Sequence, residues 1–97
     1  MVKVIIKKSD KSDKKYVAIF TRDNGRKKST HFGASGMNDY TITGDKERRR
    51  LYRNRHKKDL NTGDYMRAGY LSYYILWGDS KSIRQNINSY KNRFNLK

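Results

Sequence analysis

The first third of the chain alternates apolar and polar residues with the period of a β-strand. From Val2 to Lys7, aliphatic side chains recur at every second position, which predicts a strand with one buried face. Tyr16–Arg22 is apolar on both faces, so we expect it to be the central strand. Asn24-Gly25 favours a tight hairpin turn because both residue types tolerate positive φ. The polar segment Arg26–Phe32 then suits a returning edge strand, and the three strands form an antiparallel meander.

Beyond the predicted strands, apolar residues take the spacing of α-helices. We expect one helix from Gly44 or Asp45 to about Leu60, with acidic residues in its first turn and lysines in its last. Tyr65–Trp77 is the most apolar stretch and predicts a buried central helix. Asp79 or Ser80 is expected to cap a last helix, in which apolar residues at i, i+4, i+7 and i+11 form one stripe: Ile83, Ile87, Tyr90 and Phe94.

A glycine-bearing loop, Gly33–Gly44, separates the predicted sheet from the helices. Its glycines permit positive φ, and three residues are expected to anchor it: Met37, Tyr40 and Ile42. No Gly-Lys-Ser/Thr sequence follows, and the glycine spacing fits neither common nucleotide fingerprint. We therefore do not expect a nucleotide-phosphate loop here.

Together these elements predict an α+β fold, with a three-stranded antiparallel meander followed by three packed helices. The 97 residues are expected to form a single domain, 1–97. Only 34% of the residues are apolar, which is low for a globular domain. Disorder is nevertheless disfavoured, because the chain has no proline, 12% aromatic residues and a periodic apolar pattern. We expect a thin core rich in tyrosine.

Basic side chains dominate the composition. Lys and Arg number 24 against 9 Asp and Glu, which gives a formal net charge of +15. A small domain of this charge favours a polyanionic partner, most often nucleic acid, with a membrane surface or an acidic protein shell as alternatives. The absence of cysteine excludes disulfides, and two histidines are too few for a structural zinc site, so no cofactor is expected. The N-terminal apolar run is too short for a signal peptide or a membrane span.

The strongest functional signal is a basic segment within the predicted helix 45–60. Between Lys46 and Lys58 it carries eight Lys or Arg against one Glu, whereas an ordinary solvated helix mixes both signs. We expect Arg49, Arg50, Arg53 and Lys57 to spread over the side opposite Leu51 and Tyr52, where a partner reaches them. The candidate nucleic-acid-binding residues are Arg48, Arg49, Arg50, Arg53, Arg55, Lys57 and Lys58, with Lys27 and Lys28 beside the hairpin turn.

A second basic group surrounds the first loop. It either extends the positive surface or keeps the strand edges soluble, and comprises Lys7, Lys8, Lys11, Lys14 and Lys15.

Aromatic residues and histidines are assigned structural roles. Helical spacing favours core packing over stacking on unpaired bases for Tyr65, Tyr70, Tyr73, Tyr74 and Trp77. His31 and His56 accompany no pair of carboxylates at a recognised spacing, which favours hydrogen-bonded structural histidines over a metal-dependent nuclease site. The sequence shows no nucleophile constellation, and we expect the protein not to be an enzyme.

Several segments together resemble a known family: His31–Thr41, Asp45–Arg49, Tyr52–His56 and Leu76-Trp77. The most specific is His-Phe-Gly-Ala followed by Asp-Tyr-Thr. The chain resembles small, basic, functionally uncharacterised proteins of nucleocytoplasmic large DNA viruses, the chlorella-virus and mimivirus relatives, over most of its length. The resemblance implies a viral origin and a location in the virion or the infected host cell. No catalytic residue is established in that family, so the resemblance transfers no site.

Two function classes follow from charge and resemblance. The first is a non-enzymatic virion protein that binds nucleic acid electrostatically, most simply double-stranded DNA without sequence preference, and helps to package or condense it. The alternative is a minor capsid protein that docks on the shell or the inner membrane through protein contacts. Such a protein would expose a contiguous apolar patch, expected to include Trp77, Tyr73 or Phe94.

Overall fold

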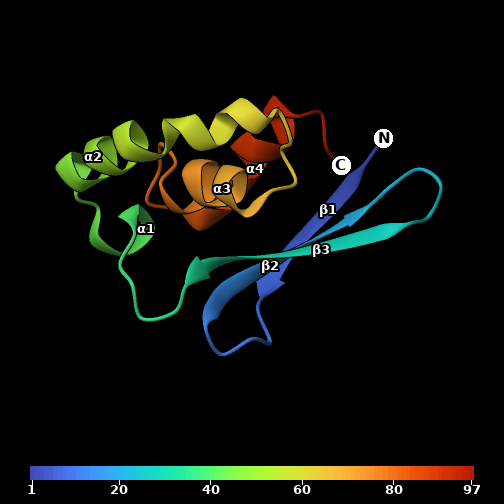
Figure 1. Cartoon of the computed structure of the whole chain (residues 1–97), viewed down its shortest axis with the longest axis horizontal. Helices are drawn as coiled ribbons and strands as arrows, with labels where there is room; N and C mark the ends of the chain where they lie inside the picture. The colour runs from blue at the N-terminus through green and yellow to red at the C-terminus, as the bar shows by residue number, and fades with distance from the viewer.

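The computed structural model describes all 97 residues and places a three-stranded sheet beside a group of helices (Figure 1). Strands β1 (Lys3–Lys8), β2 (Lys14–Thr21) and β3 (Lys27–Ala34) are antiparallel in the order β1-β2-β3. The predicted meander with a central second strand is confirmed. At the β2–β3 turn, Gly25 has φ of +84°, and the Arg22 amide donates to the Arg26 carbonyl oxygen at 2.8 Å.

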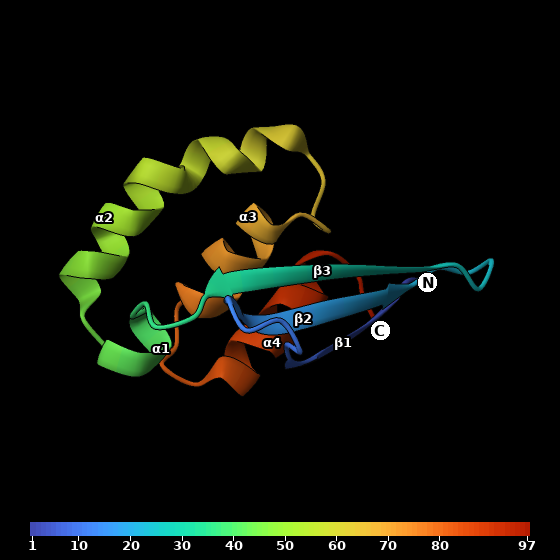
Figure 2. The same ribbon diagram turned by 60° about the horizontal axis from the view of Figure 1, so that its bottom comes forward.

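The C-terminal end of the chain lies along the outer edge of β1. The Val4 amide donates to the Lys97 carbonyl oxygen at 3.0 Å, and the Lys97 amide donates to the Val2 carbonyl oxygen at 2.9 Å. The two termini accordingly lie close together (Figures 1 and 2). This pairing covers part of an edge that would otherwise present free backbone groups to other strands.

Helical segments make up most of the second half of the chain. In order they are α1 (Tyr40–Thr43), α2 (Lys46–His56), the 3₁₀ segment η1 (Lys57–Thr62), α3 (Ala68–Leu71), the π-helical segment η2 (Ser72–Leu76) and α4 (Ile83–Arg93). The α+β class, a meander followed by helices, is confirmed. The predicted helix to Leu60 is α2 continued by η1. A further short helix, α1, forms inside the segment predicted as a glycine loop.

The most apolar stretch is not the single helix that was expected from Tyr65 to Trp77. Asp64 instead begins a turn in which its carboxylate accepts a hydrogen bond from the Met66 amide at 3.0 Å, so α3 starts only at Ala68. From residue 72 the helix widens, and the Trp77 amide donates to the Ser72 carbonyl oxygen, five residues earlier, at 3.0 Å. Apolar periodicity located this helix but did not reveal the side-chain hydrogen bond that delays its start.

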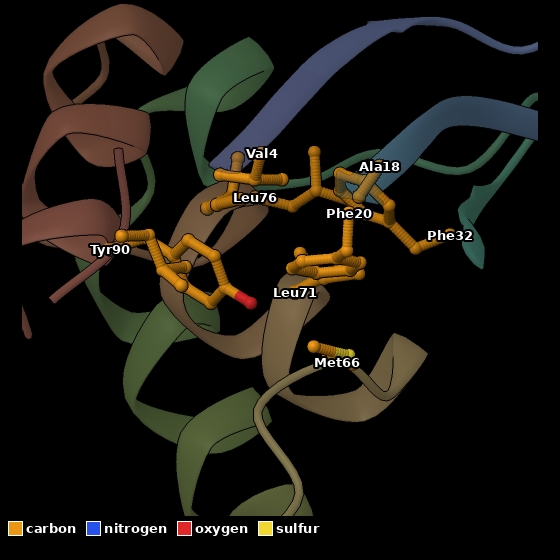
Figure 3. Close-up of a cluster of buried hydrophobic side chains, with 10 residues drawn as sticks. Val4, Ala18, Phe20, Phe32, Met66, Leu71, Leu76 and Tyr90 are labelled. Carbon is orange, nitrogen blue, oxygen red and sulfur yellow. The ribbon is translucent and has the colours of Figure 1, made fainter. Parts of the chain in front are cut away.

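The hydrophobic core lies between one face of the sheet and the helices. Figure 3 shows Val4, Ala18, Phe20 and Phe32 of the sheet together with Leu71 and other helical residues. These side chains alternate along their strands, as one buried face of a sheet requires. Val17, on the opposite face, is buried but does not belong to this cluster. The complete set of buried core residues is Val4, Ala18, Phe20, Phe32, Met66, Leu71, Ile75, Leu76, Tyr90 and Leu96.

The predicted stripe on α4 does face the core. Tyr90 is fully buried, and the other three stripe residues are half-buried against the core cluster: Ile83, Ile87 and Phe94. The helix is capped by Ser82, whose hydroxyl accepts a hydrogen bond from the Gln85 amide at 3.2 Å, and not by the predicted Asp79 or Ser80. Burial raises the pKa of the Tyr90 phenol, with smaller contributions from Tyr65 and Asp64.

Candidate nucleic-acid interface

Helix α2 lies on the outside of the molecule, farther from the sheet than α3 (Figure 2). None of its 11 residues is buried. The helix begins at Asp45, whose carboxylate accepts hydrogen bonds from the amides of Glu47 at 3.0 Å and Arg48 at 3.1 Å. This N-cap satisfies two backbone donors and favours the positive end of the helix dipole. The Asp45 cap thus stabilises the start of an exposed helix that carries many cations.

Aromatic stacking attaches α2 to the end of η2. The ring of Tyr52 stacks on Trp77, with centroids 4.4 Å apart and planes at 8°, and on His56, with centroids 4.2 Å apart. The pKa of the Tyr52 phenol is raised, chiefly by burial and also by the Asp59 carboxylate. Tyr52 therefore faces the body of the protein, as the sequence predicted.

Arg49 and Arg53 also face the body, which contradicts their predicted position on the free side of the helix. Arg53 Nε donates to the Trp77 carbonyl oxygen at 2.8 Å, and its Nη2 donates to Asp79 Oδ1 at 2.8 Å. Arg49 Nη1 donates to the carbonyl oxygens of Gly78 at 3.3 Å and Asp79 at 3.1 Å. The prediction is wrong because the backbone oxygens after η2 are strong acceptors that both guanidinium groups reach without burying their charge.

Leu51 was expected near the core, yet its side chain is 49% exposed. The remaining cations of the basic segment are exposed as well: Lys46, Arg48, Arg50, Arg55, Lys57 and Lys58. Of these, only Arg50 has a carboxylate partner, Glu47. That contact holds the pKa of Glu47 below its usual value. α2 and η1 thus present six exposed cations against one exposed acid, Glu47, and the partly exposed Asp59, which bonds to His56.

A cleft of about 480 Å³ opens between α2, the end of η2 and the loop after β3. Arg48, Leu51 and Arg55 line it from α2, on one face of the helix at i, i+3 and i+7. Met37 lines it from the loop, and its side chain is 63% exposed. Trp77 lines it as well. The sequence did not predict this cleft, because its walls come from segments far apart along the chain.

A buried ion pair forms another part of the cleft wall. Lys15 Nζ lies 2.6 Å from Asp39 Oδ2, and the two side chains are 15% and 3% exposed. Asp39 also caps α1, because its Oδ1 accepts a hydrogen bond from the Thr41 amide at 2.9 Å. The Asp39 carboxylate is therefore neutralised and fully used inside the chain, whereas Arg48 and Arg55 at the same cleft have no anionic partner.

The second basic group surrounds a shallow hollow of about 500 Å³ beside the β1–β2 loop. Four of its five predicted lysines line the hollow, with three serines: Lys8, Lys11, Lys14, Lys15, Ser9, Ser12 and Ser35. Lys15 lines both this hollow and the cleft. Lys27 and Lys28 are exposed near the β2–β3 hairpin, at the opposite end of the molecule from α2, so the fold does not bring them to the basic helix (Figure 2).

Both histidines are hydrogen-bonded within the chain. His31 Nδ1 lies 2.7 Å from Ser9 Oγ, and His56 Nδ1 lies 3.0 Å from Asp59 Oδ2. No three His, Asp or Glu side chains are grouped so that they could hold a metal ion. Neither the length nor the apolar character of any helix suffices for it to cross a membrane.

Comparison with known proteins yields one family match. The model of a family of unknown function (DUF5754) matches residues 4–56, slightly more than half of the chain. The matched segment runs from β1 to the end of α2, and it includes Arg48, Leu51 and Arg55 of the cleft but not Trp77. No curated protein and no solved structure matches the chain.

Proposed function

We propose that this chain, which belongs to the DUF5754 family of unknown function, binds nucleic acid through the outward side of α2. One observation carries the proposal: α2, an 11-residue helix with no buried residue, exposes four cations against one acid, and η1 continues it with two further exposed lysines. Such a helix contributes little to the core, so its composition is better explained by a partner than by folding. The proposed contacts are Lys46, Arg48, Arg50, Arg55, Lys57 and Lys58.

The mechanism is electrostatic. Each cation that neutralises a phosphate releases a condensed counterion, so affinity falls as salt rises. Arginine suits this role because its planar guanidinium binds phosphate oxygens in a bidentate manner. Phosphate contacts carry no sequence information, so binding without sequence preference is expected. The hollow beside the β1–β2 loop shares Lys15 with the cleft wall and adds three further lysines to the basic surface: Lys8, Lys11 and Lys14.

The proposed role is structural and non-enzymatic. The resemblance to small basic proteins of large DNA viruses leads us to propose packaged DNA in the virion as the setting. A protein that condenses DNA requires exposed cations, and this chain has a formal net charge of +15.

Exposed apolar side chains favour the second candidate, a minor capsid protein. Met37 and Ile42 are 63% and 57% exposed, close together in the chain before α2. The three residues expected in such a patch are only partly exposed: Tyr73, Trp77 and Phe94. A capsid partner would then contact the loop after β3 and α1, instead of the predicted patch that includes Trp77.

The test compares two charge-reversal pairs in salt titrations of DNA binding. Arg48→Glu/Arg55→Glu changes α2, and Lys27→Glu/Lys28→Glu makes the same change in net charge at the far end of the sheet. We expect the α2 pair to weaken binding at least tenfold and to lower the salt slope by about two, one for each phosphate that the variant no longer neutralises. The hairpin pair should have a smaller effect.

Equal weakening by both pairs would contradict the assignment to α2, because binding would then follow net charge alone. A flat salt dependence of the unmodified protein would contradict electrostatic binding altogether. Unchanged DNA binding by the α2 pair, together with failure to incorporate into particles, would favour the capsid candidate. Thermal unfolding of both variants controls for folding, and the exposed positions should change stability by less than about 0.5 kcal/mol per site.

A further inference from the structure

We propose that the cleft beside α2 accepts an unpaired nucleotide, so that the chain binds single-stranded nucleic acid more tightly than duplex. The proposal rests on the nucleic-acid binding proposed above and names the form of nucleic acid that the site takes. It starts from a stripe of three residues on α2: Arg48, Leu51 and Arg55, at i, i+3 and i+7. Two cations thus flank one aliphatic side chain along the same cleft wall.

Two apolar residues of the cleft wall are left largely open to solvent. Leu51 is 49% exposed and Met37 is 63% exposed, and both line the cleft from different segments. In a domain with so few apolar residues, leaving two large ones open to water at one place is costly. An occupant with a flat apolar surface would cover both.

The charges define what else the occupant must carry. Arg48 and Arg55 have no anionic partner, and they stand two helical turns apart, about 10 Å along the axis. The wall contains one carboxylate, Asp39. Lys15 neutralises it, and it caps the N-terminus of α1. The site therefore favours an occupant that combines negative charge with an apolar face.

An unpaired nucleotide has both properties. Its phosphates are anionic, and its base offers an apolar face that duplex bases keep stacked inside the helix. A volume of about 480 Å³ is in the range of small-ligand sites. Trp77 and Tyr52 also line the cleft, and Asn38 supplies a side-chain amide for the edge of a base. The lysine-lined hollow adjoins the cleft at Lys15 and suits neighbouring phosphates of the same strand.

Trp77 supplies the measurement, since it is the only tryptophan of the chain and it lines the cleft. We would titrate the protein with a 12-nucleotide thymidine oligomer and with a 12-base-pair duplex, following both tryptophan fluorescence and the anisotropy of a label on the DNA. The expected result is quenching of Trp77 by the single strand but not by the duplex. We also expect about tenfold tighter binding of the single strand.

Leu51→Ser tests the cleft, and Ile42→Ser is its matched control. Both residues are exposed aliphatic side chains, but Ile42 does not line the cleft. We expect Leu51→Ser to weaken single-strand binding about tenfold, because the serine loses the apolar surface that would cover the base, and to leave duplex binding unchanged. Ile42→Ser should leave both unchanged.

Three outcomes would overturn the inference without contradicting duplex binding by the cations of α2. They are equal affinity for single strand and duplex, no quenching of Trp77, and no effect of Leu51→Ser on the single strand. Quenching by an acidic peptide but not by the thymidine oligomer would overturn it as well, because the occupant would then be a protein segment. If neither nucleic acid binds, the proposed function fails together with the inference.

Discussion

Arg53 Nε donates a hydrogen bond to the backbone carbonyl oxygen of Trp77 at 2.8 Å, and this bond ties α2 to the end of η2. The same guanidinium reaches Asp79 Oδ1 at 2.8 Å. Because α2 buries no residue, its attachment depends on such contacts and on the stacking of Tyr52 on Trp77. Some arginines of the basic helix are thus structural, and others are free for a partner.

Arg53→Ala should therefore destabilise the protein, whereas Arg50→Ala should not. Arg53 makes a partly buried hydrogen bond to the Trp77 carbonyl oxygen and an exposed one to Asp79, and their removal should lower the free energy of unfolding by about 1–2 kcal/mol. Arg50 pairs with Glu47 on an exposed surface, and its removal should leave the urea midpoint unchanged, because exposed ion pairs contribute little to stability. Urea unfolding followed by circular dichroism measures both. Equal midpoints for the two variants would show that Arg53 does not hold α2.

The Arg53–Asp79 contact should respond to acid. The hydrogen bond from Arg53 holds the pKa of the Asp79 carboxyl below its usual value, with smaller contributions from the charges of Arg53, Arg49 and Arg93. A carboxyl whose pKa is lower in the folded chain stabilises it above the unfolded pKa of about 4, and that contribution disappears as pH falls through the folded value. An NMR titration should show the Asp79 pKa rising towards its ordinary value in Arg53→Ala. No rise would contradict the contact in solution.

The Lys15–Asp39 pair should be strongly coupled. Lys15→Met leaves the Asp39 carboxylate, only 3% exposed, without its cation, and should cost about 3 kcal/mol. Asp39→Asn keeps an oxygen to cap α1 and leaves a lysine that retains some solvent contact, so it should cost less. The double variant should be more stable than the sum of the single effects predicts, by at least about 1 kcal/mol. Additive effects in denaturant unfolding would show that the pair is not a direct interaction.

Hydrophobic periodicity was sufficient to predict the meander, the central position of β2 and the core-facing stripe of α4. These features depend on the burial of apolar side chains, and the spacing of those side chains can be read directly from the sequence. Periodicity did not predict the inward turn of Arg49 and Arg53, because three of their four hydrogen bonds go to backbone oxygens, which no side-chain pattern marks. The prediction that Arg49 and Arg53 lie on the free side of the helix is therefore wrong.

The cleft could not be predicted for a second reason. Lys15, Met37, Leu51 and Trp77 are separated by long stretches of chain, and only the folded arrangement of β2, the loop after β3, α2 and the end of η2 brings them to one place. The exposed Leu51 gave a partial signal, since it is the one aliphatic residue inside the basic helix. Its neighbours at i−3 and i+4 are both arginine, a stripe that helical geometry alone places on one face.

Asn86 is a buried polar residue that the sequence did not indicate, and it fits because residue 78 is glycine. The Asn86 side chain donates to the carbonyl oxygens of Ile75 at 2.8 Å and Ser80 at 2.7 Å, and it accepts from the Ser80 amide at 3.0 Å. These bonds fasten the η2–α4 connection to α4. A Cβ at position 78 would lie 2.3 Å from the Tyr74 carbonyl oxygen and 2.7 Å from Asn86 Cγ.

Gly78→Ala should therefore be among the most damaging single changes outside the hydrophobic core. The added methyl group meets backbone as well as the Asn86 amide, so the connection must shift, and we expect a destabilisation of about 3 kcal/mol from overpacking and from weakened hydrogen bonds. Gly63→Ala is the control, because its Cβ would contact nothing within 4 Å and only the φ of +68° opposes it, at about 1 kcal/mol. Combining Gly78→Ala with Asn86→Ala removes the side-chain clash but not the clash with Tyr74, so it should restore little stability. Thermal and urea unfolding rank the stabilities of these variants. A Gly78→Ala variant as stable as Gly63→Ala would show that the η2–α4 connection is packed less tightly than these distances indicate.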